Sequence, residues 1–176
     1  IDTLPVGQPF DWVEKLSIEL TTDMLAILFD FPWEERHRLT AWSDALGDIE
    51  SFDTTELRQA RTAKAFEMGA AFKELWDRKA LNPGKHDLIS IMLQSDAMKH
   101  MSEHEFMGNL ILLIVGGNDT TRNSMSAYAY GLHCFPEERA KLEANHDPEL
   151  AVNAMHEIIR WQTPLAHMRR TAMEDT

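Results

Sequence analysis

The sequence predicts a mainly α-helical fold with one unusually long central helix and little or no β structure. Signals that start helices recur along the chain, and strand patterns offer little competition. From Met68 onward, apolar residues recur at Phe72, Leu75 and Trp76, which is the spacing of one helical face. The hydrophobic fraction of 44% is that of a globular protein.

Each helix is predicted from its own start signal. A capping residue stands three positions before a glutamate in Asp11–Glu14, Asp53–Glu56 and Ser102–Glu105. Proline occupies an expected first helical position at Pro32, Pro136 and Pro148, the last directly after Asp147. We therefore predict helices at about residues 11–29, 33–46, 54–79, 87–97, 102–133, 136–145 and 148–162. The helix from Ser102 would run about 45 Å, through the thickness of a domain.

Composition argues against several classes of function. The chain has 17 basic residues against 29 acidic ones, a net charge of -12, which disfavours a nucleic-acid binder or a polybasic membrane contact. The longest apolar run, Leu110 to Val115, has six residues, whereas a bilayer requires roughly 20, so we predict no transmembrane segment. The single cysteine, Cys134, forms no intrachain disulfide and predicts a reducing compartment, the cytoplasm.

The stretch from Gly116 to Thr121 is the most informative in the sequence. Two adjacent glycines inside a helix cost about 1 kcal/mol each, and the close approach of a flat or diatomic ligand would offset that cost. Thr120 can bond back to the carbonyl of Gly116, which opens or bends a helix. A carboxylate at Asp119 beside this hydroxyl is suited to proton delivery into a dry site. Alternatively, the glycines end one helix and Asn118 to Thr121 cap the next.

A second motif follows about forty residues later. Glu157 and Arg160 form an E-x-x-R pair on one helix face, which by itself carries no functional signal. It is followed by Trp161-Gln162-Thr163-Pro164 and then by Arg170-Thr171-Ala172-Met173-Glu174-Asp175. This order of motifs resembles the cytochromes P450 throughout, from about their E helix to just past their K helix. Two stretches, GGNDTTRNSMS and EIIRWQTPLAHMRRTA, are most similar to the corresponding stretches of bacterial alkane and fatty-acid terminal hydroxylases of that family.

The resemblance implies roles for residues on the long helix. Asp119 and Thr120 match the acid–alcohol pair that protonates iron-bound dioxygen, so that the O–O bond breaks heterolytically. Gly116 and Gly117 match the groove where dioxygen sits. Leu112, Val115 and Gly116 lie on or beside the face of Thr120 and form an aliphatic wall without charge, which suits a hydrocarbon chain.

The resemblance also implies roles nearer the end of the chain. Glu157 and Arg160 match a structural ion pair that holds the K helix to a later loop. Arg170 matches the residue whose guanidinium holds a propionate of haem b. The family's cysteine loop is not present, and Cys134 does not replace it, because His133-Cys134-Phe135-Pro136 lacks that loop's glycines. We therefore expect residues 1–176 to be an incomplete catalytic domain, cut at both ends, with no metal ligand of its own and inactive in isolation.

The function that the resemblance implies is a haem-thiolate monooxygenase. It would insert one atom of O2 into an apolar substrate, at a terminal C–H bond of a medium-chain alkane or fatty acid. Electrons would come from NAD(P)H through a ferredoxin and its reductase, or through a fused reductase. The alternative is a non-catalytic helical interaction module in which both motifs are coincidences.

Overall fold

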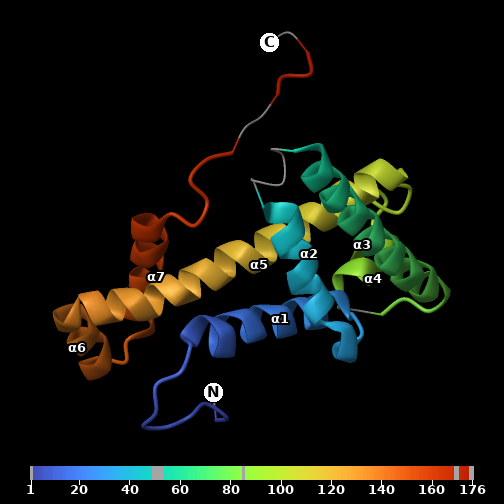
Figure 1. Cartoon of the computed structure of the whole chain (residues 1–176). Coiled ribbons are helices and arrows are strands. Elements are labelled where there is room, and N and C mark those ends of the chain that lie inside the picture. The colour runs from blue at the N-terminus through green and yellow to red at the C-terminus, as the bar shows by residue number, and fades with distance from the viewer. Residues whose placement is uncertain (1, 49–53, 85, 169–170, 175–176) are drawn as a thin grey trace. The chain divides into compact units, whose positions relative to one another are not determined.

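The computed structural model describes residues 2–48, 54–84, 86–168 and 171–174 (Figure 1). Within these residues all regular structure is helical and no strand occurs, which confirms the predicted fold class. The chain divides into two compact units, Ile1–Arg122 and Asn123–Thr176. None of the described helices is long and apolar enough to cross a membrane.

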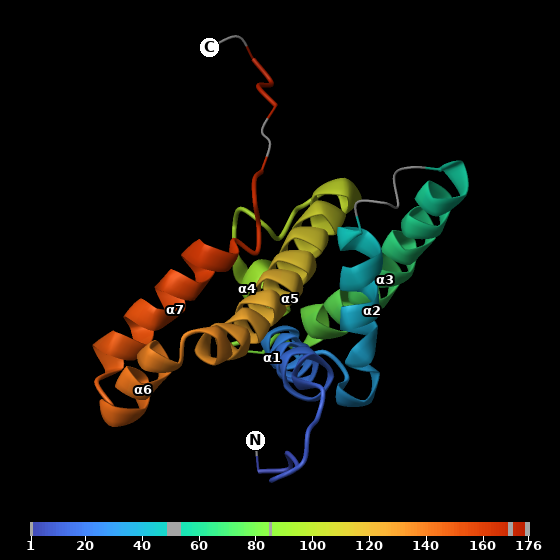
Figure 2. The same cartoon turned by 60° about the vertical axis from the view of Figure 1, so that its left-hand side comes forward.

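The first unit contains four helices and most of a fifth. A short π-helix, Val13–Ile18, leads into α1, Glu19–Phe29, and a 3-10 turn, Trp33–Glu35, precedes α2, His37–Gly47. The next helices are α3, Thr55–Leu81, and α4, Leu88–Gln94, followed by the long α5, Glu103–Cys134. Within this unit α2 packs against α1 and α3, and α3 packs against α4 (Figure 2).

Local capping accounts for where these helices begin. Ser102 and Glu105 form a reciprocal capping box, because the Glu105 amide donates to Oγ of Ser102 at 3.3 Å while the Ser102 amide donates to the Glu105 carboxylate at 2.8 Å. The helix α3 is capped by Thr54, whose hydroxyl accepts from the Leu57 amide. The predicted cap at Asp53 lies outside the described residues.

Several helices differ from the prediction at their ends. The predicted helices 11–29 and 33–46 begin as a π-helix and a 3-10 turn, so the α-helix starts later in each, and the helix predicted at 136–145 ends at Ala144, one residue early. The helix α4 ends at Gln94, three residues before the predicted end, because Ser95 adopts an extended backbone with φ -78° and ψ 124°. At the end of α1, Asp30 adopts a left-handed conformation with φ 50°, which stops that helix at its predicted end, Phe29.

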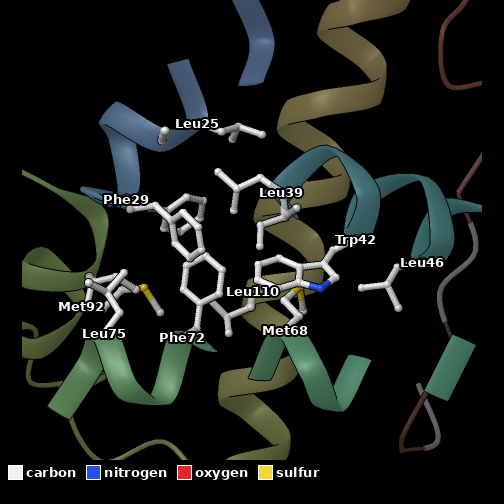
Figure 3. Packing of buried hydrophobic residues seen from close by; sticks show 14 residues of the cluster. Leu25, Phe29, Leu39, Trp42, Leu46, Met68, Phe72, Leu75, Met92 and Leu110 are labelled. Atoms are coloured by element: carbon white, nitrogen blue, oxygen red, sulfur yellow. The ribbon is translucent and has the colours of Figure 1, made fainter. Parts of the chain in front are cut away.

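The core of the first unit is built around aromatic side chains. Phe72 of α3 lies 5.0 Å from Phe29, 5.4 Å from Phe31 and 6.2 Å from Trp42, measured between ring centroids (Figure 3). Aliphatic and thioether side chains from α1 to α5 surround these rings, namely Leu25, Leu39, Leu46, Met68, Leu75, Ile89, Met92, Leu110 and Ile114. The predicted apolar face from Met68 is thereby confirmed for Met68, Phe72 and Leu75, which are all buried. Full burial of one such side chain stabilises the fold by about 1.5–3 kcal/mol.

The second unit consists of the end of α5 with α6, Pro136–Ala144, and α7, Pro148–Gln162. Both later helices begin with the predicted proline, and Asp147 caps α7 by accepting from the Glu149 amide at 3.0 Å. A groove of about 420 Å³ lies between these helices, with Gly131, Phe135 and Trp161 in its lining.

Candidate active site on the long helix

The Gly116 to Thr121 stretch lies in the interior of α5, with helical residues on both sides. The helix is continuous through both glycines, so the alternative in which they end one helix and begin another is wrong. Oγ1 of Thr120 donates to the Gly116 carbonyl at 2.6 Å, which confirms the predicted back-bond. The fully buried residues Leu110, Ile114 and Asn118 repeat at every fourth position and mark the face of α5 that points into the core.

The opposite side of α5 carries an open strip, which we define as Gly108, Leu112, Gly116 and Thr120. These residues stand four apart and so share one face. A Cβ atom added at Gly108 or at Gly116 would meet nothing within 4 Å, and the Leu112 side chain is 60% exposed. The open strip is therefore uncharged, mostly apolar and accessible down to the backbone.

The four predicted pocket residues divide between two environments. Leu112 and Gly116 lie on the open strip. Gly117 instead faces α1, since an added Cβ would lie 3.1 Å from Cδ2 of Leu25. Val115 faces α2, where its Cγ1 lies 3.3 Å from the Cβ position of Gly47. Of the two adjacent glycines, Gly116 thus has open space beside it, whereas Gly117 permits close packing against α1.

Asp119 is only partly accessible and is held by a cation. Its side chain is 27% exposed, and Oδ1 accepts from Nη2 of Arg122 at 2.7 Å. The same Nη2 lies 3.0 Å from Oδ1 of Asp44, at the end of α2. A Cβ at Gly47 would lie 2.8 Å from the other oxygen, Oδ2 of Asp119, so a larger residue at position 47 would require the carboxylate to shift.

The charge state of Asp119 reflects opposing effects. Burial disfavours the carboxylate and raises its pKa above the ordinary value; the Arg122 guanidinium lowers the pKa, and the negative charge of Asp44 raises it. The Ser43 hydroxyl, which makes no hydrogen bond of good geometry within the described residues, also lowers it. The net result is a raised pKa, so Asp119 holds a proton at higher pH than an exposed aspartate. Such a shift is typical of groups that exchange protons in a reaction.

The E-x-x-R pair forms as predicted within α7. Nε and Nη2 of Arg160 donate to the two carboxylate oxygens of Glu157 at 2.7 Å and 2.6 Å, a bidentate contact. Hydrogen bonding to Arg160 lowers the pKa of Glu157, while Glu157 raises that of Arg160. Both side chains are more than half exposed in this chain. Arg170, the predicted propionate partner, lies outside the described residues.

Sequence reasoning missed three residues at this site. Arg122 was detectable, because an acid and a base at i and i+3 form a pair on one helix face. Asp44 and Gly47 carried no such signal, since they lie far from Asp119 in sequence and reach it only through the packing of α2 against α5.

Solved structures of cytochromes P450 match this chain along almost its whole length. Cytochrome P450-153 from Novosphingobium aromaticivorans is 54% identical, with a TM-score of 0.84, and the match covers 99% of this chain and 41% of that one. CYP153D17 from Sphingomonas sp. PAMC 26605 is 61% identical, with a TM-score of 0.83, and the match covers 99% of this chain and 43% of that one.

A curated relative agrees. Linalool 8-monooxygenase of Pseudomonas putida is 34% identical over an alignment of 181 positions, which covers 100% of this chain and 43% of that protein. No protein-family model matches the chain. The chain belongs to the cytochrome P450 family, and it spans less than half the length of these relatives. Similarity to monooxygenases over the whole chain does not favour the alternative of a non-catalytic helical module.

Cytochromes P450 use haem, with electrons that come from NAD(P)H through redox partners. The described residues of α5 fit such a group. The open strip offers a surface on which no Cβ projects at Gly108 or Gly116, so a flat ring can approach the backbone. Its Leu112 side chain is apolar and accessible, and the Thr120 hydroxyl lies at one end. Among the described residues no cluster of side chains that could bind a metal ion occurs.

Proposed function

We propose that the protein containing this chain is a haem-thiolate monooxygenase that hydroxylates an apolar substrate. The observation that carries the proposal is the open strip of α5, uncharged and accessible, with a carboxylate of raised pKa adjacent in sequence at Asp119. Linalool 8-monooxygenase, a relative over the whole chain, acts by its name on linalool. Residues 1–176 would supply part of one catalytic domain.

The substrate that we propose is a medium-chain alkane or fatty acid, hydroxylated at a terminal C–H bond. An aliphatic chain suits Leu112 because the contact involves no polar group that would lose its hydrogen bonds to water. A polar substrate would lose such bonds along this strip at about 1–3 kcal/mol per group. The resemblance of the motif regions to alkane and fatty-acid hydroxylases supports the same class.

The chain's own residues would position the substrate and move protons. The oxygen-activating chemistry would be supplied by haem when it is bound. Hydroxylation with O2 consumes two electrons and two protons and releases one oxygen atom as water, so protons have to enter an apolar site. Oγ1 of Thr120 can pass a proton toward the open side of Gly116 while Asp119 replenishes it from the side that faces α2. Gly116 keeps the path open because it has no side chain.

Electrons would come from NAD(P)H through a ferredoxin and its reductase, or through a fused reductase, with O2 as the second substrate. The cytoplasm, which supplies NAD(P)H, is the compartment that we propose. The single cysteine of this chain, Cys134, is exposed at the end of α5 and fits a reducing setting.

The test uses the full-length protein, reconstituted with haem and a redox partner. A series of linear alkanes and fatty acids should give terminal alcohols, identified by mass spectrometry. Leu112→Asp should abolish turnover of alkanes, because it places a charge on the apolar strip, whereas Leu112→Met should preserve it. A wild-type protein that binds haem yet oxidises none of these substrates would contradict the substrate class. Failure to bind haem at all would contradict the whole proposal.

A further inference from the structure

One guanidinium nitrogen is shared between two carboxylates beside the open strip. Nη2 of Arg122 lies 2.7 Å from Oδ1 of Asp119 and 3.0 Å from Oδ1 of Asp44. The Arg122 side chain is 18% exposed and Asp44 is 53% exposed, so the arrangement extends from a half-buried carboxylate on α5 to the surface at the end of α2. Because this nitrogen lies at hydrogen-bond distance from both carboxylates, its positive charge attracts both Asp119 and Asp44.

The last turn of α2 lies close to both oxygens of Asp119. Asp44 is linked to Oδ1 through Arg122. At Gly47, a Cβ would lie only 2.8 Å from Oδ2, so the glycine leaves room for that oxygen. The orientation of the Asp119 carboxylate therefore depends on α2 as well as on its own helix.

We infer that Asp44 is a positioning residue for Asp119: by sharing Arg122, it determines how tightly the Asp119 carboxylate is held and how readily that carboxylate takes up and releases protons. The electrostatic part of this inference rests only on the geometry of the three side chains. The part that concerns proton delivery during turnover rests on the proposed function.

Among the described residues, the charges that act on Asp119 come from α5 and α2, and they act in opposite directions. After burial, which raises the pKa of Asp119, the largest effects are the lowering by Arg122 on α5 and the raising by Asp44 on α2. Removing the negative charge of Asp44 should lower the pKa of Asp119, because it removes a negative charge close to that carboxylate. Removing the positive charge of Arg122 should raise the pKa. A residue that served only to pack α2 against α5 would produce no such pair of opposite shifts.

The experiment compares four variants of the full-length, haem-loaded protein. Asp44→Asn removes the charge with little change of shape, Asp44→Glu retains it, and Arg122→Gln removes the cation. Glu34→Gln is the matched control, because it removes one exposed negative charge from the same unit at a position that does not contact Asp119. Asp44 is more than half exposed, so its variants should fold.

Two readouts are needed. The first is the pH titration of the infrared band of the Asp119 carboxyl group. This band is assigned by its loss in Asp119→Asn, and its titration does not depend on turnover. The second is the pH profile of product formed per NAD(P)H consumed. We expect both midpoints to move to lower pH in Asp44→Asn and to higher pH in Arg122→Gln. Asp44→Glu and Glu34→Gln should retain the wild-type midpoint, and the Asp44→Asn shift should shrink in high salt.

The outcomes separate this inference from the proposed function. An unmoved infrared midpoint in Asp44→Asn, or a shift in the same direction as that of Arg122→Gln, would overturn the inference. Absence of hydroxylated product in the wild type would overturn the proposed function instead, and the infrared titration would still decide whether Asp44 acts on Asp119. Infrared shifts without a parallel change in the pH profile would overturn the role of Asp44 in proton delivery.

Discussion

The ammonium of Lys79 should be the most costly single charge to remove from the first unit. It connects three helix ends, since Nζ lies 2.6 Å from Oδ2 of Asp30 at the end of α1 and 3.0 Å from Oδ2 of Asp87 at the start of α4. The Lys79 and Asp87 side chains are only 8% and 9% exposed. Asp87 also accepts from the amide and the hydroxyl of Ser90, at 2.9 Å and 2.8 Å.

The magnitude follows from this geometry. Two unit charges 3.0 Å apart attract each other by roughly 5 kcal/mol at an effective dielectric constant of about 20, before the cost of burying them is subtracted. Lys79→Met leaves the Asp87 carboxylate buried without its cation, which should cost about 3–5 kcal/mol of the free energy of unfolding. Asp30 is 71% exposed and should contribute no more than about 1 kcal/mol.

Urea unfolding of the full-length protein measures the effect, and α3 supplies a matched control. Lys73 on the same helix pairs with Asp77 at 2.5 Å, but both side chains are more than half exposed. Lys73→Met should therefore cost about 0.3–0.5 kcal/mol. The double variant Lys79→Met/Asp87→Asn should recover part of the loss, because no unpaired charge remains. Equal destabilisation by Lys79→Met and Lys73→Met would show that burial of the Lys79 ion pair does not determine its contribution.

The pH dependence of this loss has a definite sign. Burial alone would raise the pKa of Asp87, but hydrogen bonds from Ser90 and Lys79 outweigh it and the pKa is lowered. An aspartate with a lowered pKa in the folded state adds stability above its unfolded pKa, and this stability is lost as the pH falls through the folded pKa. The difference between wild type and Lys79→Met should therefore narrow in acid, where Asp87 is protonated in both proteins.

Further predictions concern the site and the core. Thr120→Ala should keep NAD(P)H consumption but divert it to peroxide, and unchanged coupling of NAD(P)H to product would count heavily against the role of its hydroxyl. Gly47→Ala should displace the Asp119 carboxylate by about 0.6 Å, because Oδ2 would have to move from 2.8 Å to an ordinary contact distance of about 3.4 Å from the new Cβ. A crystal structure of the variant would reveal whether the bond to Arg122 survives. Phe72→Ala should cost about 3–5 kcal/mol in urea unfolding because Phe72 is fully buried, whereas Phe66→Ala, at a side chain that is 71% exposed, should cost less than about 0.5 kcal/mol. Similar losses for the two phenylalanines would contradict the described core.

Several features of the site were predictable because they depend on neighbours in sequence. The capping box at Ser102 and Glu105 marked the start of α5, and the bond from Thr120 to Gly116 follows from four-residue spacing on a helix. The bidentate pair of Glu157 and Arg160 also needs only one helix to form. Interactions of this kind form within one or two turns, so the order of residues is sufficient to predict them.

The order of residues was thus sufficient to predict most of the helices, several of their caps and the motif order that indicates the family. The tertiary structure alone decided that Gly116 faces open space while Gly117 packs against Leu25, and that Asp44 shares Arg122 with Asp119. These differences arise from which helix face meets which neighbour. Contacts between α2 and α5 join residues some seventy positions apart, and only the packing of the whole unit determines which side chains come within hydrogen-bonding distance.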